Sequence, residues 1–154
     1  VTPSEMPPTY ELEALKDQAA RQEEKYLRLA AEYDNFRKRT AKEKEAIWND
    51  AKADAALAFL PVYDNLERAL KQETADEAYK KGVEMTMNQL KTVLEKLGIT
   101  EIEALGQPFD PTLHNAVMHI EDENFGENTV AEVFQAGFRL GDKVVRFAMV
   151  KVAN

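Results

Sequence analysis

Apolar residues follow helical spacing up to about residue 97 and strand spacing thereafter. From Leu12 to Leu60 the chain has no Gly or Pro, and its apolar positions follow first a heptad and then an eleven-residue spacing, which keeps them on one helix face. We therefore predict a long helix over residues 10–60. Because one helix cannot bury such a stripe on itself, a second copy of the chain is the expected partner. Residues 1–9 contain three prolines and predict a disordered lead-in.

A second helical region follows Pro61, which we expect to interrupt or kink the long helix. An amphipathic pattern resumes after this proline. Thr74 and Glu77 then match a capping box that opens another helix, and Gly98 is suited to end it. Two such helices from each of two copies predict a dimeric four-helix bundle over residues 61–97.

The contact between the two copies is expected to use the apolar helix faces. Its predicted residues are Leu29, Tyr33, Phe36 and Ile47 in the long helix, and Leu66, Leu90 and Leu94 in the bundle. From Thr40 onward the long stripe includes small and polar residues such as Ala51 and Asp54, which bury little apolar area. We therefore expect the helix pair to open at a lower temperature than the bundle, so that the long helix acts as a thermosensor.

Beyond Gly98 the apolar pattern has a period of two, and Val and Phe become frequent. Asp110 followed by Pro111 predicts one helical turn, and Gly141-Asp142 predicts a hairpin turn. The expected strands cover residues 100–104, 117–121, 129–135, 138–140 and 144–152. The predicted fold class is α+β: a long paired helix, a dimeric four-helix bundle and a small, mostly β C-terminal domain over residues 98–154.

Composition restricts the class of protein. The 154 residues carry a net charge of −8, include 44% apolar residues and contain no cysteine, which argues against a disordered acidic tail and excludes disulfides and thiolate metal sites. No apolar run is long enough to cross a membrane. The lack of cysteine fits a reducing compartment, and we expect a cytoplasmic protein with no membrane partner. Because the chain starts at Val1 and without an apolar signal, we expect that a preceding segment has been removed.

Catalytic chemistry finds little support in the residues. His114 and His119 do not form a recognised metal-ligand motif, and no phosphate-binding loop, dinucleotide fingerprint or nucleophile motif occurs. We expect His114 to hydrogen-bond within the turn at Asp110, and His119 to point outward from a strand. The sequence therefore predicts no enzyme, no metal and no cofactor.

A basic cluster interrupts the acidic background of the long helix. Its members are Arg37, Lys38, Arg39, Lys42 and Lys44, and Glu43 is the only acidic residue among them. Three interpretations are open: a solvated helix face, a docking surface for an acidic protein, or a nucleic-acid site. The net charge of −8 and the position of the cluster after the heptads argue against nucleic acid. Gly82, inside the second bundle helix, is either simply tolerated or lets another backbone approach closely.

Four segments together resemble one protein family. The C-terminal region carries Phe109-Asp110-Pro111-Thr112-Leu113-His114-Asn115-Ala116-Val117, and then Gly137-Phe138, Asp142 and the alternating residues Val145 to Val152. The helical region carries Asp34-Asn35-Phe36-Arg37-Lys38-Arg39-Thr40 and the segment Leu60 to Leu70. Over residues 20–154 the chain resembles GrpE, the nucleotide exchange factor family of DnaK-type chaperones.

This resemblance implies a homodimer that binds the ATPase domain of a DnaK-type chaperone, opens its nucleotide cleft and promotes ADP release without catalysing a reaction. It implies partner contacts at Arg37, Gly82, Lys143 and Val152. Lys143 stands where many relatives have arginine, and a second basic helix position falls on Ala46. Lys42 or Lys44 is the expected substitute for that position. A structural coiled-coil adaptor with a β recognition domain would explain the apolar periodicity equally well.

Overall fold

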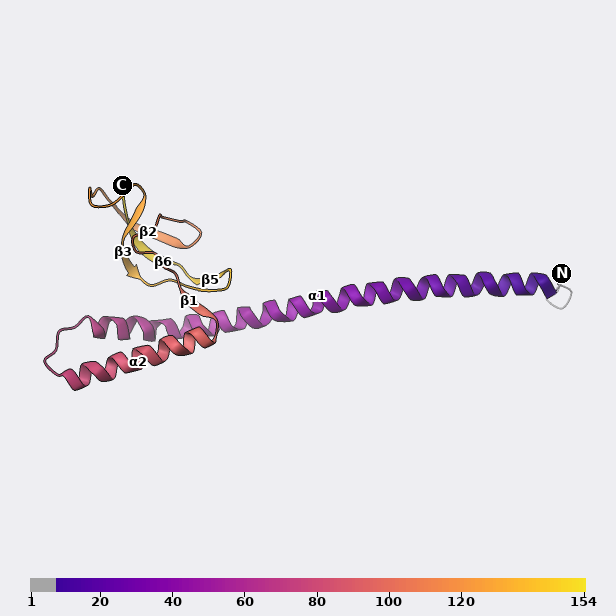
Figure 1. The fold of residues 1–154 in the computed structure, drawn as a ribbon, viewed down its shortest axis with the longest axis horizontal. Coiled ribbons are helices and arrows are strands. Elements are labelled where there is room, and N and C mark those ends of the chain that lie inside the picture. Colours follow the sequence, from indigo (N-terminus) through magenta and orange to yellow (C-terminus); the bar gives the residue numbers. More distant parts are fainter. Residues whose placement is uncertain (1–7) are drawn as a thin grey trace. The chain divides into compact units, whose positions relative to one another are not determined.

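A computed structural model describes residues 8–154 and confirms the predicted α+β class. Among these residues, two helices are followed by six strands. Figure 1 shows the helices in the earlier part of the chain and the strands in the later part. The helices are α1 (Pro8–Leu70) and α2 (Glu77–Lys96). The strands are β1 (Ile99–Glu101), β2 (His114–Ile120), β3 (Thr129–Gln135), β4 (Phe138–Leu140), β5 (Lys143–Arg146) and β6 (Ala148–Ala153). The chain divides into two compact units, the first ending at Ile47 and the second comprising Trp48–Asn154.

Helix α1 extends beyond both predicted ends. Pro8 and Thr9 already belong to it, and a proline is accepted in a first turn because the amide hydrogen there has no helical partner. Residues 1–7 of the predicted lead-in lie outside the described residues. The predicted interruption at Pro61 is wrong, since the helix continues to Leu70. Pro61 is exposed, so water can solvate the carbonyl group that loses its amide donor.

The second helix begins later than its capping motif predicts. Asp76, and not Thr74, is the N-cap residue, and its carboxylate accepts a hydrogen bond of 3.1 Å from the backbone N–H of Tyr79. The Thr74 hydroxyl instead accepts from the backbone N–H of Asp76. At the other end Gly98 has a φ of 80°, a conformation that glycine adopts without strain.

Six strands form two separate three-stranded sheets. The first has the antiparallel order β1-β4-β5, and the second has the order β2-β6-β3 with β2 parallel to β6. The single strand predicted over residues 144–152 is therefore wrong, because the chain changes sheets at Phe147. A Cβ atom on Gly137 would collide with the backbone nitrogen of Ala148. Only glycine allows the two chain segments to cross so closely.

The remaining short elements differ modestly from expectation. The strand expected over residues 100–104 is β1, which ends at Glu101. The predicted helical turn after Asp110 is a hydrogen-bonded turn, in which the carbonyl of Asp110 accepts from the backbone N–H groups of Leu113 and His114. β3 and β4 have the bounds that the period-two pattern predicts.

Two apolar cores hold the second unit together. One core joins both helices to the first sheet through Leu60, Tyr63, Leu94, Ile99 and Phe138, together with their neighbours. Figure 1 shows α2 running back alongside the last turns of α1. The chain changes from helix to strand at Gly98, but residues on both sides of this position belong to the same core. The other core, which lies within the C-terminal region, consists of Ala104, Val130, Ala148, Val150 and Val152.

Candidate partner-binding surface

The β4–β5 hairpin presents Lys143 at its tip, next to helix α1. Gly141 has a φ of 56° and allows the tight turn between the two strands. The Lys143 ammonium group lies 2.6 Å from a carboxylate oxygen of Asp50. Both side chains remain largely exposed, so Lys143 is accessible to a partner but already has an anionic neighbour.

A second ion pair anchors the base of the hairpin. The Arg146 guanidinium group donates two hydrogen bonds, of 2.8 and 2.9 Å, to the two carboxylate oxygens of Asp64 in α1. It also donates to the carbonyl oxygen of Ala136. The pair is mostly buried, and a two-pronged contact of this kind restrains orientation as well as distance. The sheet is therefore held to the helix independently of Lys143.

The basic cluster in α1 is partly neutralised by a residue that the sequence reasoning did not weigh. The Asp34 carboxylate forms ion pairs with the Lys38 ammonium group, at 3.0 Å, and with the Arg37 guanidinium group, at 3.1 Å. These two cations lower the pKa of the Asp34 carboxyl group. Spacings of three and four residues on a helix could have revealed both pairs. Among residues 8–154, Lys42 and Lys44 have no ion pair.

Gly82 and Val152 differ in accessibility. A Cβ atom on Gly82 would meet nothing within 4 Å, so this exposed position leaves room for another backbone. Val152 is 3% exposed and belongs to the core of the second sheet. The prediction that its side chain contacts a partner does not fit this burial, because an inward-facing strand residue offers the surface only its backbone. The period-two pattern identified the apolar face correctly, but that face is the interior.

The residues predicted to join two copies fall into two groups. Leu29, Tyr33, Phe36 and Ile47 are between 52% and 68% exposed, so these apolar side chains of the first unit are open to solvent. The bundle residues differ: Leu94 is buried in this chain's own core, and Leu66 and Leu90 pack against that core while partly buried. Leu94 is therefore covered within its own chain, and its contact with a second copy stays a prediction.

His114 is the one buried charged or polar residue among those described. Its Nδ1 accepts a hydrogen bond of 3.0 Å from the backbone N–H of Asp110, as the turn motif predicts, whereas its Nε2 has no partner in the described part of the chain. Burial lowers the pKa of His114, against a smaller opposing effect of the Asp110 carboxylate. A neutral imidazole fits this geometry, since Nδ1 must stay unprotonated to accept. His119 is exposed, as predicted.

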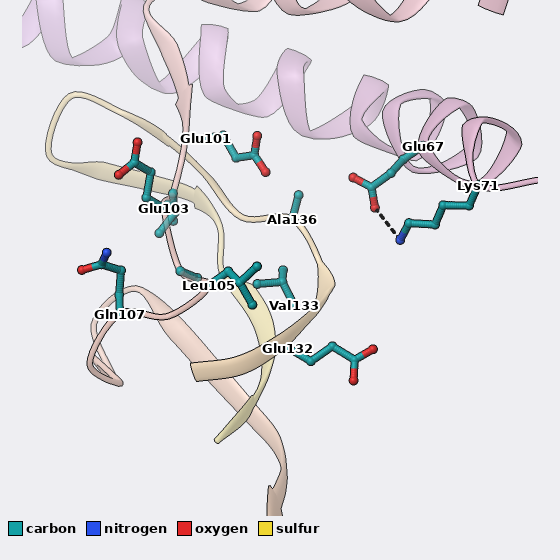
Figure 2. A pocket seen from close by; sticks show the side chains of 11 residues that line it. Glu67, Lys71, Glu101, Glu103, Leu105, Gln107, Glu132, Val133 and Ala136 are labelled. Carbon is teal, nitrogen blue, oxygen red and sulfur yellow. Dashed lines mark ion pairs between the residues drawn. The ribbon is translucent and has the colours of Figure 1, made fainter. Parts of the chain in front are cut away.

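A groove of about 770 Å³ lies between the end of α1 and the two sheets. Figure 2 shows its lining, in which four carboxylates surround a largely apolar floor. Three of these carboxylates already have partners: Glu67 pairs with Lys71, Glu132 pairs with Lys151, and Glu101 accepts from the Tyr63 hydroxyl. The lining includes no imidazole, thiol or hydroxyl group. No metal-binding cluster is found among residues 8–154, and none of their helices has an apolar stretch that would span a bilayer.

The two halves of the C-terminal motif meet in the structure. β2 and β6 pair in parallel with His114 opposite Ala148, so the segment that begins at Phe109 lies beside the last strand. A family model described as GrpE matches residues 3–154. The chain belongs to the GrpE family. The GrpE resemblance of the sequence is thus confirmed over nearly the whole length.

Individual GrpE relatives support this assignment. Protein GrpE of Clostridium acetobutylicum is 58% identical over 144 residues, which cover 94% of this chain and 68% of the relative. Protein GrpE of Clostridium beijerinckii is 57% identical over 131 residues, covering 85% of this chain and 63% of the relative. Protein GrpE of Geobacillus stearothermophilus is 48% identical over 133 residues, covering 84% and 60%. The chain spans less than two thirds of the length of the last two relatives.

Proposed function

We propose that this GrpE-family protein is a co-chaperone that acts as a nucleotide exchange factor. As a homodimer it binds the ATPase domain of a DnaK-type chaperone in the cytoplasm, opens the nucleotide cleft and promotes ADP release. The observation that carries the proposal is the family assignment together with the pairing of the motif's two halves at His114 and Ala148. The exchange factor prefers the open cleft of the chaperone, whereas ADP prefers the closed cleft. Each therefore weakens the binding of the other equally.

Each unit, taken by itself, presents exposed residues that we propose for docking. Lys143 on the hairpin, Gly82 on α2 and the basic residues Arg37, Lys42 and Lys44 on α1 are accessible. Val152 lies in the core of the second sheet, so a contact of this residue with the partner would involve its backbone. The homodimer is proposed because apolar residues of α1 such as Leu29, Phe36 and Ile47 are exposed, and a second copy would bury them.

The test is release of labelled ADP from a purified DnaK-type protein. We expect the wild-type chain to accelerate release, and Gly82→Asp to weaken complex formation because it adds bulk and charge at an open helix position. Gly82→Ala is the matched control, since it adds a methyl group without charge. No acceleration by the wild-type chain would favour the coiled-coil adaptor instead.

The thermosensor role belongs to this proposal as well. The apolar side chains of Leu29, Tyr33, Phe36 and Ile47 in the first unit are exposed, whereas α2 packs in a mixed core, so the first segment should open at lower free energy. Hydrogen exchange followed by mass spectrometry at rising temperature should show early loss of protection in residues 8–47 and later loss in residues 77–96. Simultaneous loss in both segments would refute temperature gating.

A further inference from the structure

The residue proposed for docking, Lys143, is already bound by a carboxylate of its own chain. Its ammonium nitrogen lies 2.6 Å from Asp50 Oδ1, and the two side chains are 42% and 60% exposed. The contact joins positions 93 residues apart. It is therefore not the pairing of near neighbours on one helix, but a tertiary contact between the hairpin tip and α1.

The place of Asp50 on the helix explains the contact. Asp50, Ala53, Ala56 and Leu60 are spaced by three, three and four residues, which places them on one helix face. Ala53, Ala56 and Leu60 are buried, and the first sheet packs against this face through Leu140 and Val145. Asp50 is the exposed residue that ends this buried stripe, where the hairpin tip arrives.

We propose that Asp50 competes with an acidic group of the chaperone for the Lys143 ammonium group, and so determines how tightly the hairpin docks. The inference rests on the function proposed above. A partner carboxylate that approaches Lys143 must displace Asp50 or lie beside it. Displacement loses the ion pair, and close approach brings two negative charges together, so both routes weaken docking.

The size of the effect follows from the exposure of the pair. Ion pairs open to solvent stabilise by amounts that correspond to about a twofold to fivefold change in an equilibrium constant. Arg146 anchors the same sheet to Asp64, so loss of the Asp50 contact should leave the hairpin in place. The competition should therefore alter affinity without altering the fold.

The experiment measures the Kd between the intact protein and the nucleotide-free ATPase domain of a DnaK-type chaperone. We expect Asp50→Asn to lower the Kd by about twofold to fivefold at low salt, with a smaller change at high salt. Asp54→Asn is the matched control, because Asp54 lies one turn away, is exposed and has no ion pair among residues 8–154. Both variants change the net charge equally, so they share any effect of overall charge on the Kd. Of the two residues, only Asp50 contacts Lys143, so Asp50→Asn alone should tighten binding.

A second comparison isolates the role of Lys143. In a Lys143→Ala background, Asp50→Asn should leave the Kd unchanged, because the competed group is gone. An unchanged or raised Kd for Asp50→Asn in the wild-type background overturns the competition, and so does equal tightening by Asp54→Asn. Failure of the wild-type chain to bind overturns the proposed function and the competition with it, whereas normal binding that is insensitive to Asp50 overturns the competition alone.

Discussion

The ion pair between Arg146 and Asp64 offers the sharpest test of what holds the first sheet to α1. Asp64→Asn keeps the size and shape of the side chain and removes its charge. The two charge-assisted hydrogen bonds, of 2.8 and 2.9 Å, would then be replaced by at most one bond from the guanidinium group to the amide oxygen. Besides this amide oxygen, the Arg146 guanidinium group would keep the Ala136 carbonyl as an acceptor.

The magnitude follows from burial. Removing one partner of a fully buried ion pair costs about 3–5 kcal/mol, whereas exposed pairs contribute about 1 kcal/mol or less. The Arg146 and Asp64 side chains are 13% and 23% exposed, which allows some water to reach the remaining charge. Since asparagine also retains one acceptor, we expect the free energy of unfolding to fall by about 2 kcal/mol.

The assay is urea unfolding at pH 7, with all variants at one protein concentration because dimerisation would couple stability to concentration. Asp54→Asn serves as the control, since it removes an exposed α1 carboxylate that has no ion pair in the described part of the chain. Its effect should stay within about 0.5 kcal/mol. If Asp64→Asn loses no more than this control, the two-pronged contact does not stabilise the junction and the reasoning is wrong.

Two further predictions concern buried positions in the C-terminal region. Burial lowers the pKa of His114 below its ordinary value of 6.5, so the folded state binds fewer protons than the unfolded state. The stability that is present above pH 6.5 is therefore lost as the pH falls below this value, by up to about 1.4 kcal/mol per pH unit. His114→Gln should flatten this dependence in urea titrations between pH 7.5 and 5, and an unchanged slope would exclude His114 as its source. Gly137→Ala should lower the free energy of unfolding by about 2 kcal/mol or more, because its methyl group would meet the Ala148 backbone. Gly82→Ala, with open space around it, should raise stability by about 0.5–1 kcal/mol, and equal effects of the two changes would contradict the close crossing.

Local pattern was sufficient wherever one periodicity continued without interruption. The absence of Gly and Pro predicted the long helix, and alternation predicted β3 and β4 with their observed ends. The C-terminal motif predicted the family, because its two halves are recognisable as strings of residues. His114 was also placed correctly, since its hydrogen bond to the Asp110 turn spans four residues.

Expectations failed where the outcome depends on what packs against a residue. Helix α1 continues through Pro61 because this residue is exposed, so water can solvate the carbonyl group that loses its amide donor. The identity of the residue alone does not tell whether it is exposed. Leu94 has the spacing of an interface residue, and Val152 is a partner contact that the family resemblance implies, but each lies in a core of its own chain. Apolar periodicity identifies the face that is buried without identifying the element that buries it.

The partners of charged side chains divide in the same way. Asp34 lies three and four residues from Arg37 and Lys38, so helix geometry alone brings these charges together. Asp50 meets Lys143 across 93 residues, and Asp64 meets Arg146 across 82. These two ion pairs form because the chain crosses itself at Gly137 and because the first sheet packs on α1. Both features depend on many weak contacts between segments that are distant in the sequence. The order of residues therefore establishes the helices, most strands and the family, whereas the packing of distant segments establishes which charges are paired and which remain open to a partner.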